Sequence, residues 1–448
     1  RCTDMDIVVR NGTVVDPVSL EEKRVDVAIK DGVFAFVGSG APEGVRELDA
    51  SGLLVLPGLI DTHMHFEHRV GDPYTVLKSL LLQGVTTAIG GHCGEGVMMK
   101  VYKDWFSQNP VLNMGFMIGA TTLRKAVGAD DRYSPATSEQ VGMMEPLLEE
   151  NLHEGALGLS FGLEYAPGTS RDELFRLAQV VSRFKHRFIS IHVRYDGRRS
   201  PEAVAEAIEI SKRSGVRVQV SHLGSMTAFG HSRDAIGMIE QARREGVDVT
   251  FDVYPYYAFA ARIGSAVFDP GFEQRLGKGL ESLEVSTGRF KGVPLTAELF
   301  ARAREEDPDA YVIAHVMNPE EVDLCLLHKD SAIASDAVLR GDEGHPRAAG
   351  TFPRGIGILR KAGLSWPEAV RHATSRPAEM IWHRGGRITE GANAELAVID
   401  PDSYEDRGRF GAPLTAPGGV KWVVLNGVVV VEGCEIVGPP SGRILLGE

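Results

Sequence analysis

The middle of the chain alternates short apolar runs with amphipathic segments. Eight apolar runs have the length of a buried strand: 57–65, 85–93, 111–120, 156–161, 187–193, 217–222, 248–255 and 331–336. Helices with recognisable starts lie between them; Ser170 and Glu173, for example, have the spacing of a capping box. Apolar strands that alternate with such helices predict a parallel sheet, and eight units predict a (β/α)8 barrel over residues 57–385. Residues 257–310 break the alternation, so we expect an insertion or lid there.

Both ends of the chain have an all-β character instead. The dipeptides Asn11-Gly12, Asp31-Gly32 and Asn426-Gly427 each separate two runs rich in β-formers. Asn-Gly and Asp-Gly favour the tight turns of β-hairpins, so we expect a hairpin at each of them. We therefore predict one small β-sandwich domain, built jointly from residues 1–56 and 386–448, beside the barrel.

Composition and charge exclude several classes of partner. The chain has 448 residues with a net charge of −13 and no basic stripe, so we expect no nucleic-acid partner. It contains no apolar run of the ~18 residues that a membrane helix needs, and we expect no membrane partner. Its four cysteines are scattered and predict no disulfide scaffold, which favours a cytoplasmic protein. A small-molecule substrate fits these limits, and a homo-oligomer is compatible with them.

Candidate metal ligands stand where the predicted strands end. His63 and His65 are alternate residues of the first strand, so both imidazoles face one side. Later strands end at further candidates: Cys93 (beside His92), His192, His222 and Asp336. The carboxyl ends of barrel strands meet on one face, and histidine, thiolate and carboxylate are ligands that zinc accepts. The residues alone leave alternatives open, because a buried cysteine is often inert, His92 competes with it, and Asp336 fits a helix cap.

These motifs resemble the amidohydrolase superfamily and, within it, the D-aminoacylase (N-acyl-D-amino-acid deacylase) family. The resemblance rests on stretches spread through most of the chain: residues 57–65, 84–87, 92–94, 155–160, 165–168, 192, 221–222, 252–256, 335–336, 345–347, 350–354 and 391–397. It implies that Cys93 is a ligand that bridges two metal positions, with one or two zinc ions bound. Residues 156–162 contain no lysine that could supply the carboxylated-lysine bridge of hydantoinases, which supports another bridge. Glu164 is the alternative bridging residue.

The chain departs from the family at one substrate-binding position. The resemblance implies a lysine two residues after the sixth-strand histidine, but Gly224 stands there. Arg194, Arg347 and Arg354 are candidates to bind the substrate carboxylate instead, because a guanidinium grips a carboxylate with two hydrogen bonds. A structural ion pair is an equally good interpretation of each arginine.

The resemblance also implies an activity. Zinc would lower the pKa of bound water, and Asp336 would accept the water proton as general base and pass it to the leaving amine. Tyr254 would donate a hydrogen bond to the developing oxyanion. We expect hydrolysis of an N-acyl-D-amino acid or a close analogue. The alternatives are a cyclic-amide hydrolase (hydantoinase- or dihydroorotase-like), a dipeptide hydrolase and, more remotely, a non-catalytic barrel that serves as a binding module.

Overall fold

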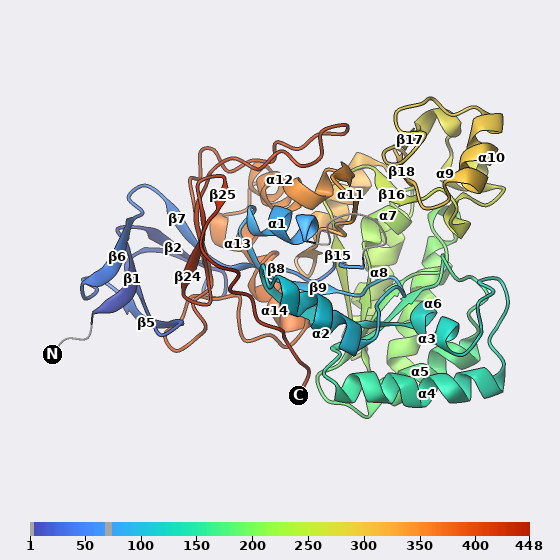
Figure 1. Ribbon diagram of the computed structural model, residues 1–448, viewed down its shortest axis with the longest axis horizontal. Coiled ribbons are helices and arrows are strands. Elements are labelled where there is room, and N and C mark those ends of the chain that lie inside the picture. Colours follow the sequence, from blue (N-terminus) through green and yellow to red (C-terminus); the bar gives the residue numbers. More distant parts are fainter. Residues whose placement is uncertain (1–3, 68–73) are drawn as a thin grey trace.

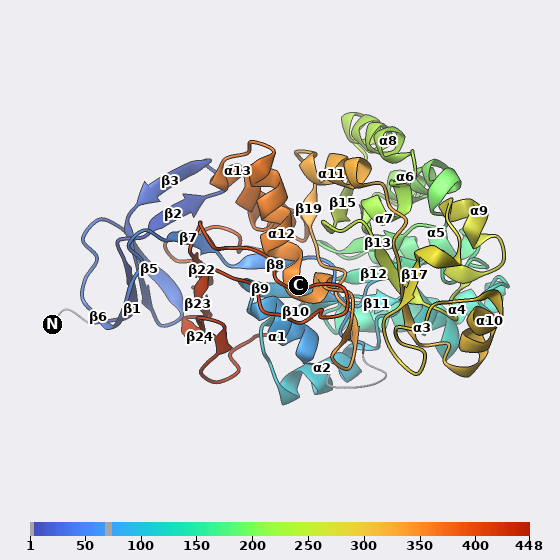
Figure 2. The same ribbon diagram turned by 90° about the horizontal axis from the view of Figure 1, so that it is seen from above.

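The computed structural model describes residues 4–67 and 74–448. Strands from the two chain ends lie together at one end of an elongated molecule, and most helices lie at the other (Figure 1). The view from above shows the same division, with the N-terminal strands β1–β6 beside the C-terminal strands β22–β24 (Figure 2). In the described part of the chain, no helix combines the length and apolarity that a membrane span requires.

The terminal segments form two sheets. The first has the order β5-β4-β1-β6, with β1 Met5–Arg10, β4 Asp26–Lys30, β5 Val33–Gly38 and β6 Gly44–Asp49. The second has the order β25-β24-β23-β22-β7-β2-β3, with β2 Thr13–Asp16, β3 Glu21–Arg24, β7 Leu54–Pro57, β22 Leu396–Ile399, β23 Val420–Leu425, β24 Val428–Glu432 and β25 Glu435–Ile436. Buried side chains from both sheets, among them Val9, Val14 and Val424, form one apolar cluster.

The hairpin expected at Asn11-Gly12 is wrong. Strand β1 pairs with β4 and β6, whereas β2 pairs with β3 and β7, so the turn carries the chain from one sheet to the other. Val9 and Val14 both become buried between the sheets in this arrangement. The other two hairpins are confirmed, since β4 pairs antiparallel with β5 around Asp31-Gly32 and β23 with β24 around Asn426-Gly427.

The middle of the chain contains a parallel strand at each predicted position. The strands are β8 Leu59–Asp61, β9 Val85–Gly90, β10 Asn113–Phe116, β11 Ile118–Gly119, β12 Gly158–Gly162, β13 Phe188–His192, β14 Arg217–Val220, β15 Val249–Val253 and β19 Ala332–Ile333. Hydrogen bonding gives the orders β10-β9-β8 and β11-β12-β13-β14-β15-β19. Backbone contacts link these sheets at both edges: the Leu157 amide donates to Phe116 O at 2.8 Å, and Met64 forms a parallel bridge with Ala337.

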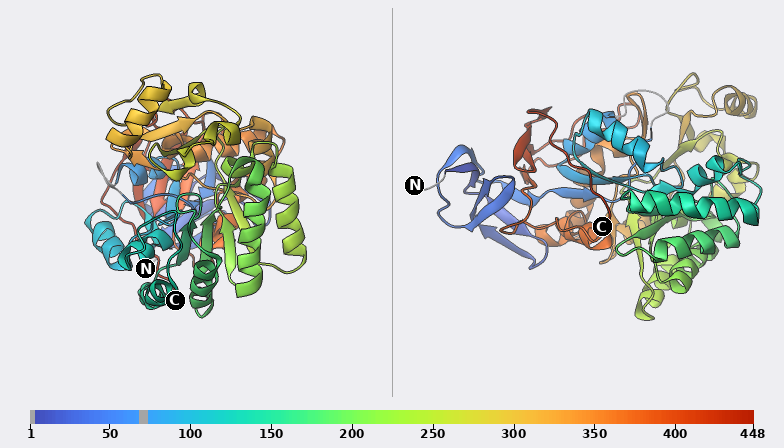
Figure 3. Two further views of the ribbon diagram at one scale, coloured as in Figure 1. Left: turned by 90° about the vertical axis from the view of Figure 1, so that its right-hand side faces the viewer. Right: turned by 60° about the horizontal axis from the view of Figure 1, so that its bottom comes forward.

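Helices surround these strands (Figure 3, left). They are α1 Thr75–Leu81, α2 Met99–Gln108, α3 Ala120–Ala126, α4 Ser138–His153, α5 Arg171–Ser182, α6 Ser200–Ser214, α7 Leu223–Thr227, α8 Ser232–Arg244, α11 Pro319–Leu327, α12 Arg347–Lys361, α13 Trp366–Arg371 and α14 Ser375–Met380, with a 3-10 turn at Gly197–Arg199. The predicted capping box is present at α5, where the Ser170 hydroxyl accepts from the Glu173 amide. Ser365 caps α13 in the same way.

The segment predicted to interrupt the alternation folds as a small unit. Strands β16 Phe259–Arg262, β18 Tyr311–Ala314 and β17 Leu283–Val285 form an antiparallel sheet in that order. Helices α9 Phe272–Leu276 and α10 Ala297–Glu306 and the 3-10 turns Ala266–Phe268 and Leu280–Ser282 accompany it (Figure 1). Strand β18 ends four residues past the predicted boundary at 310. A short hairpin, β20 Leu339–Arg340 with β21 Glu343–Gly344, follows β19.

Candidate metal centre and active site

Four candidate ligands converge at the ends of three strands. His63 and His65 follow β8, Cys93 follows β9, and Asp336 follows β19. One ligand atom from each lies within 4.8 Å of the other three, and all four residues are buried. Asp336 Oδ1 lies 3.2 Å from His63 Nε2 and 3.0 Å from His65 Nε2. The strand predicted over 57–65 ends at Asp61, so both histidines lie beyond it, and their imidazoles nevertheless face the same cluster.

Cys93 also belongs to a second group, with His192 and His222. The ligand atoms of these three residues lie within 4.8 Å of one another as well. Cys93 Sγ lies 3.6 Å from His63 Nε2 and 3.7 Å from His222 Nε2. A single sulfur atom therefore stands between two sets of candidate ligands. His92 belongs to neither set in the described residues; it stacks on His63 at 4.1 Å, and its Nδ1 lies 2.9 Å from Ser190 Oγ.

Three of the candidate ligands have an unusual backbone conformation. Cys93, His222 and Asp336 have φ angles of 57°, 33° and 48°, in the left-handed region that residues other than glycine rarely adopt. Each stands two or three residues beyond the end of a strand, where the chain turns over the sheet end. Such local strain costs roughly 1–3 kcal/mol per residue and concentrates at functional sites. Its occurrence at three neighbouring residues indicates a functional site at this edge of the sheet.

The buried charges of the cluster favour ionised ligands. Burial alone would raise the pKa of the Cys93 thiol, but the charge of His63 and the neighbouring imidazoles of His192 and His222 hold it well below the ordinary value. Burial acts in the same direction on Asp336, and the charges of Arg347 and His63 outweigh it, so its pKa is also well below the usual range. A thiolate and a carboxylate are the forms that bind a metal ion.

Hydrogen bonds orient two of the imidazoles. His63 Nδ1 lies 3.3 Å from Asp252 Oδ2, and His222 Nδ1 lies 2.8 Å from Ser225 Oγ, so both rings turn Nε2 toward Cys93. Asp252 also accepts from the His222 amide at 2.8 Å and from the Gln219 amide side chain at 2.6 Å. Imidazole nitrogens, a thiolate and a carboxylate that face one another are the donor set of a zinc site, so these residues fit that ion.

Glu164 lies beside the second group. Its Oε2 is 2.7 Å from His192 Nε2, while His192 Nδ1 has no hydrogen-bond partner in the described part of the chain. Burial would raise the pKa of Glu164, but the hydrogen bond from His192 lowers it overall. Glu164 joins neither ligand group in the described residues, so its role as the alternative bridge remains a prediction.

Arg347 and Tyr254 also face this cluster. Arg347 Nη1 lies 3.1 Å from Asp336 Oδ2, and the guanidinium lies 4.8 Å from the centre of the Tyr254 ring. The Tyr254 hydroxyl is buried without a hydrogen-bond partner. Burial raises the pKa of this phenol, which keeps it protonated and able to donate a hydrogen bond.

The other two arginines are engaged elsewhere. Arg194 donates to Glu206 at 2.9 Å and to Pro167 O at 2.9 Å. Arg354 donates to Pro255 O at 2.7 Å and pairs with Asp406 at 3.5 Å. The structure thus brings only Arg347, of the three predicted arginines, to the candidate ligands. At Gly224, a Cβ atom would meet Val253 and Val322 at 3.6–3.7 Å, so a side chain there would point into apolar packing.

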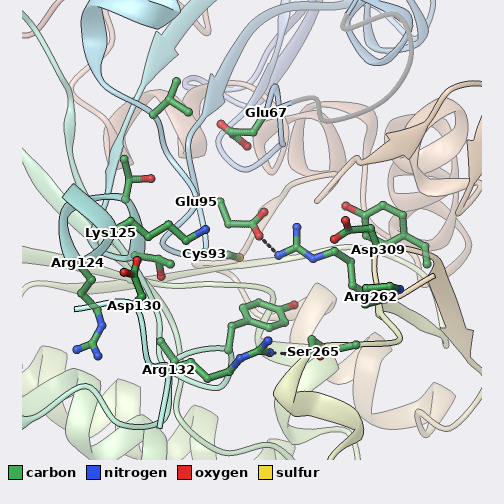
Figure 4. Close-up of a pocket in the computed structure, with 18 of the residues that line it drawn as sticks. Glu67, Cys93, Glu95, Arg124, Lys125, Asp130, Arg132, Arg262, Ser265 and Asp309 are labelled. Carbon is green, nitrogen blue, oxygen red and sulfur yellow. Dashed lines mark hydrogen bonds and ion pairs between the residues drawn. The ribbon is translucent and has the colours of Figure 1, made fainter. Parts of the chain in front are cut away.

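A cavity of about 570 Å³ opens from the cluster at Cys93. Glu95 and Arg262, which form an ion pair, lie at its centre, and Lys125 and Arg132 lie along one wall (Figure 4). Arg262 belongs to β16, so the inserted unit contributes directly to this wall. The volume falls in the range of pockets that hold small organic ligands. The four charged residues Glu95, Lys125, Arg132 and Arg262 carried no sequence signal that distinguished them from surface charges.

Comparison with known proteins agrees with this architecture. The model of the amidohydrolase family matches residues 54–430. N-acyl-D-glutamate deacylase of Alcaligenes xylosoxydans xylosoxydans is 31% identical, with 98% of this chain and 96% of the relative aligned. D-aminoacylase of the same organism is 29% identical, with 98% and 97% aligned. The chain therefore belongs to the amidohydrolase family and is a hydrolase of amide C–N bonds.

A solved structure extends the similarity to three dimensions. N-acyl-D-glutamate deacylase of Bordetella bronchiseptica, in complex with zinc and a phosphonate inhibitor that mimics the tetrahedral intermediate, superimposes with a TM-score of 0.87. The match covers 99% of this chain and 100% of that chain at 26% identity. The chain accordingly has the mixed α/β fold of the D-aminoacylases, and the predicted membership of that group is confirmed.

Proposed function

We propose that this protein is a zinc-dependent deacylase of N-acyl-D-amino acids. The observation that carries the proposal is the position of Cys93 in both candidate ligand groups, with Asp336 beside one of them. A shared thiolate, four imidazoles and one carboxylate form a donor set for one or two zinc ions. The full-length relatives that act on N-acyl-D-glutamate and other N-acyl-D-amino acids support the choice of substrate class.

The catalytic roles follow from the surroundings of each side chain. A zinc ion held by these residues would polarise the amide carbonyl and lower the pKa of water. Asp336, kept ionised by Arg347, accepts a proton from the attacking water and delivers it to the leaving amine nitrogen. Tyr254 donates its unpartnered hydroxyl to the carbonyl oxygen as negative charge develops there. Arg347 binds the substrate carboxylate with the donors that Asp336 leaves free.

We also infer the closed form of the fold. The two contacts between β10 and β12 and between β8 and β19 support an eight-stranded (β/α)8 barrel over residues 57–385. The common apolar cluster of the terminal sheets supports a composite β-sandwich of residues 1–56 and 386–448. The small β16-β18-β17 unit at the cavity wall supports an insertion or lid over residues 257–310.

A substrate panel tests the proposal. Purified protein is loaded with zinc and incubated with N-acetyl-D-amino acids, their L-enantiomers, hydantoins and dipeptides, and release of free amine or ring opening is measured. We expect free D-amino acids from the first set and little release from the second. Turnover confined to hydantoins or to dipeptides would overturn the proposal in favour of the corresponding alternative hydrolase.

A further inference from the structure

His65 is held from both sides by carboxylates. Its Nε2 lies 3.0 Å from Asp336 Oδ1, within the first candidate ligand group, and its Nδ1 lies 3.3 Å from Glu67 Oε2. Glu67 stands two residues after His65, and this contact brings its carboxylate to the outer nitrogen of the ring. Glu67 is therefore placed to accept the Nδ1 proton of His65 and leave the Nε2 lone pair facing inward.

Tyr102 fixes Glu67 in turn. The Tyr102 hydroxyl donates a hydrogen bond to Glu67 Oε1, the oxygen that His65 does not contact. Tyr102 belongs to α2 and is fully buried, and its ring stacks on Phe116 with centroids 4.1 Å apart and planes 12° apart. Burial and the charge of Glu67 raise the pKa of this phenol, so it remains a donor. The position of the Glu67 carboxylate is thus set by the packed aromatic side chain of Tyr102 on helix α2.

We infer that Tyr102 and Glu67 form a positioning relay that fixes the orientation and tautomer of His65 as a metal ligand. The inference rests on the proposed metal centre. A carboxylate that accepts from the outer nitrogen of a ligating histidine fixes its tautomer and raises its basicity, and loss of such a partner typically weakens metal binding about 10–100-fold. Neither Glu67 nor Tyr102 carried a predicted role, because their relation to His65 depends on the packing of α2.

A competing interpretation makes Glu67 itself a ligand. His65, Glu67 and Glu95 also lie close enough to hold an ion. The carboxylate of Glu95 is ion-paired with Arg262, however, and that of Glu67 accepts from Tyr102. His65 Nδ1 would have to lose its proton to join such a group, whereas the contact with Glu67 favours its retention. The existing partners therefore favour the relay.

Cobalt binding tests the relay independently of turnover. Metal-depleted wild type, Glu67→Gln and Tyr102→Phe are titrated with Co²⁺, and the visible d–d bands and the thiolate charge-transfer band report each bound equivalent. Tyr404→Phe is the matched control, because Tyr404 is also a buried phenol of the same apolar core and its hydroxyl donates to a backbone carbonyl, Gln83 O, at 2.9 Å. Thermal unfolding verifies that each variant is folded.

We expect one equivalent of Co²⁺ to bind at least about 10-fold more weakly to Glu67→Gln than to wild type. Tyr102→Phe should weaken the same equivalent by a smaller factor and alter its d–d bands, and Tyr404→Phe should match wild type. A folded Glu67→Gln with wild-type cobalt affinities and spectra would overturn the relay. If Glu67→Gln does not fold, the same result in Tyr102→Phe would overturn it. If wild type binds a third equivalent of Co²⁺ that Glu67→Gln does not bind, Glu67 is itself a ligand, and the relay is overturned as well. Wild type without any bound cobalt would refute the metal centre itself.

Discussion

Arg347 Nη1 lies 3.1 Å from Asp336 Oδ2, and both side chains are buried. The charge of Arg347 is the largest of the influences that lower the pKa of Asp336 against the effect of burial. Replacement by methionine removes that charge, so the pKa of Asp336 rises and the carboxylate is protonated at higher pH. We predict that the acidic limb of the kcat/KM profile of Arg347→Met shifts to higher pH. Arg354→Met, whose guanidinium pairs with Asp406, serves as the control and should keep the wild-type profile.

Asp336→Asn separates proton transfer from metal binding. The amide cannot accept a proton from water, and general-base catalysis typically contributes 10²–10⁴-fold, so we predict a fall in kcat of about that size. Cys93, His192 and His222 do not depend on Asp336, and bound zinc should persist at that group. Steady-state kinetics and elemental analysis of the same sample measure both effects. Near-wild-type turnover in this variant would remove Asp336 from its assigned role.

Cys93→Ala affects both ligand groups at once. Because the sulfur belongs to both groups, its loss weakens both, and we predict that the total zinc content per chain falls below the wild-type value. Cys325→Ala is the control, since Cys325 is buried in the apolar core and burial raises the pKa of its thiol to about 12. Elemental analysis after gel filtration measures the difference. Equal zinc content in the two variants would show that Cys93 is not a ligand.

The sequence predicted the order and approximate positions of the strands well, because apolar runs and turn residues act locally, but β8, β9 and β19 end three or four residues earlier than predicted. Every predicted strand of the middle segment has its counterpart, and His63, His65, Cys93, His192, His222 and Asp336 all reach one edge of the sheets. The hairpin at Asn11-Gly12 failed because local turn propensity does not specify which sheet receives the next strand. In the structure, β2 joins the second sheet, and Val14 is buried in the apolar cluster between the two sheets.

Contacts between distant segments were harder to predict. Arg194 was a fair candidate for substrate binding, but helix α6 presents Glu206 to it, and that ion pair directs the guanidinium elsewhere. Asp252 belonged to a recognised motif without an assigned role, because its contact with His63 Nδ1 spans 189 positions. Glu67 had one local signal, its place two residues after His65, but its partner Tyr102 is positioned by tertiary packing.

Glu395 lies where the C-terminal strands meet β9 and β10. Its Oε1 accepts from Asn113 Nδ2 at 2.6 Å, and burial raises its pKa from 4.5 to about 7. The folded protein therefore retains a proton that the unfolded chain releases above pH 4.5. Stability from this group is fully present below pH 4.5 and is lost as pH rises through about 7, by an amount on the order of 3 kcal/mol.

Glu395→Gln should remove this dependence on pH. We predict that the free energy of unfolding of wild type, relative to the variant, falls between pH 5 and pH 8. Denaturant titrations at both pH values, with the same zinc content in both proteins, measure the difference. An unchanged difference between the two proteins across this range would show that Glu395 does not retain its proton in the folded state.

Titration with zinc, followed by the reaction rate, tests whether zinc bound at the Cys93 centre is required for deacylation. Protein depleted of metal with a chelator receives zinc in steps, and the initial rate of amine release from an N-acetyl-D-amino acid is recorded beside the zinc bound per chain. We predict no turnover without zinc and a rate that rises as the Cys93 centre fills, with little turnover of the L-enantiomer. An undiminished rate in the metal-free protein would contradict this prediction, as would full zinc loading without release of any D-amino acid.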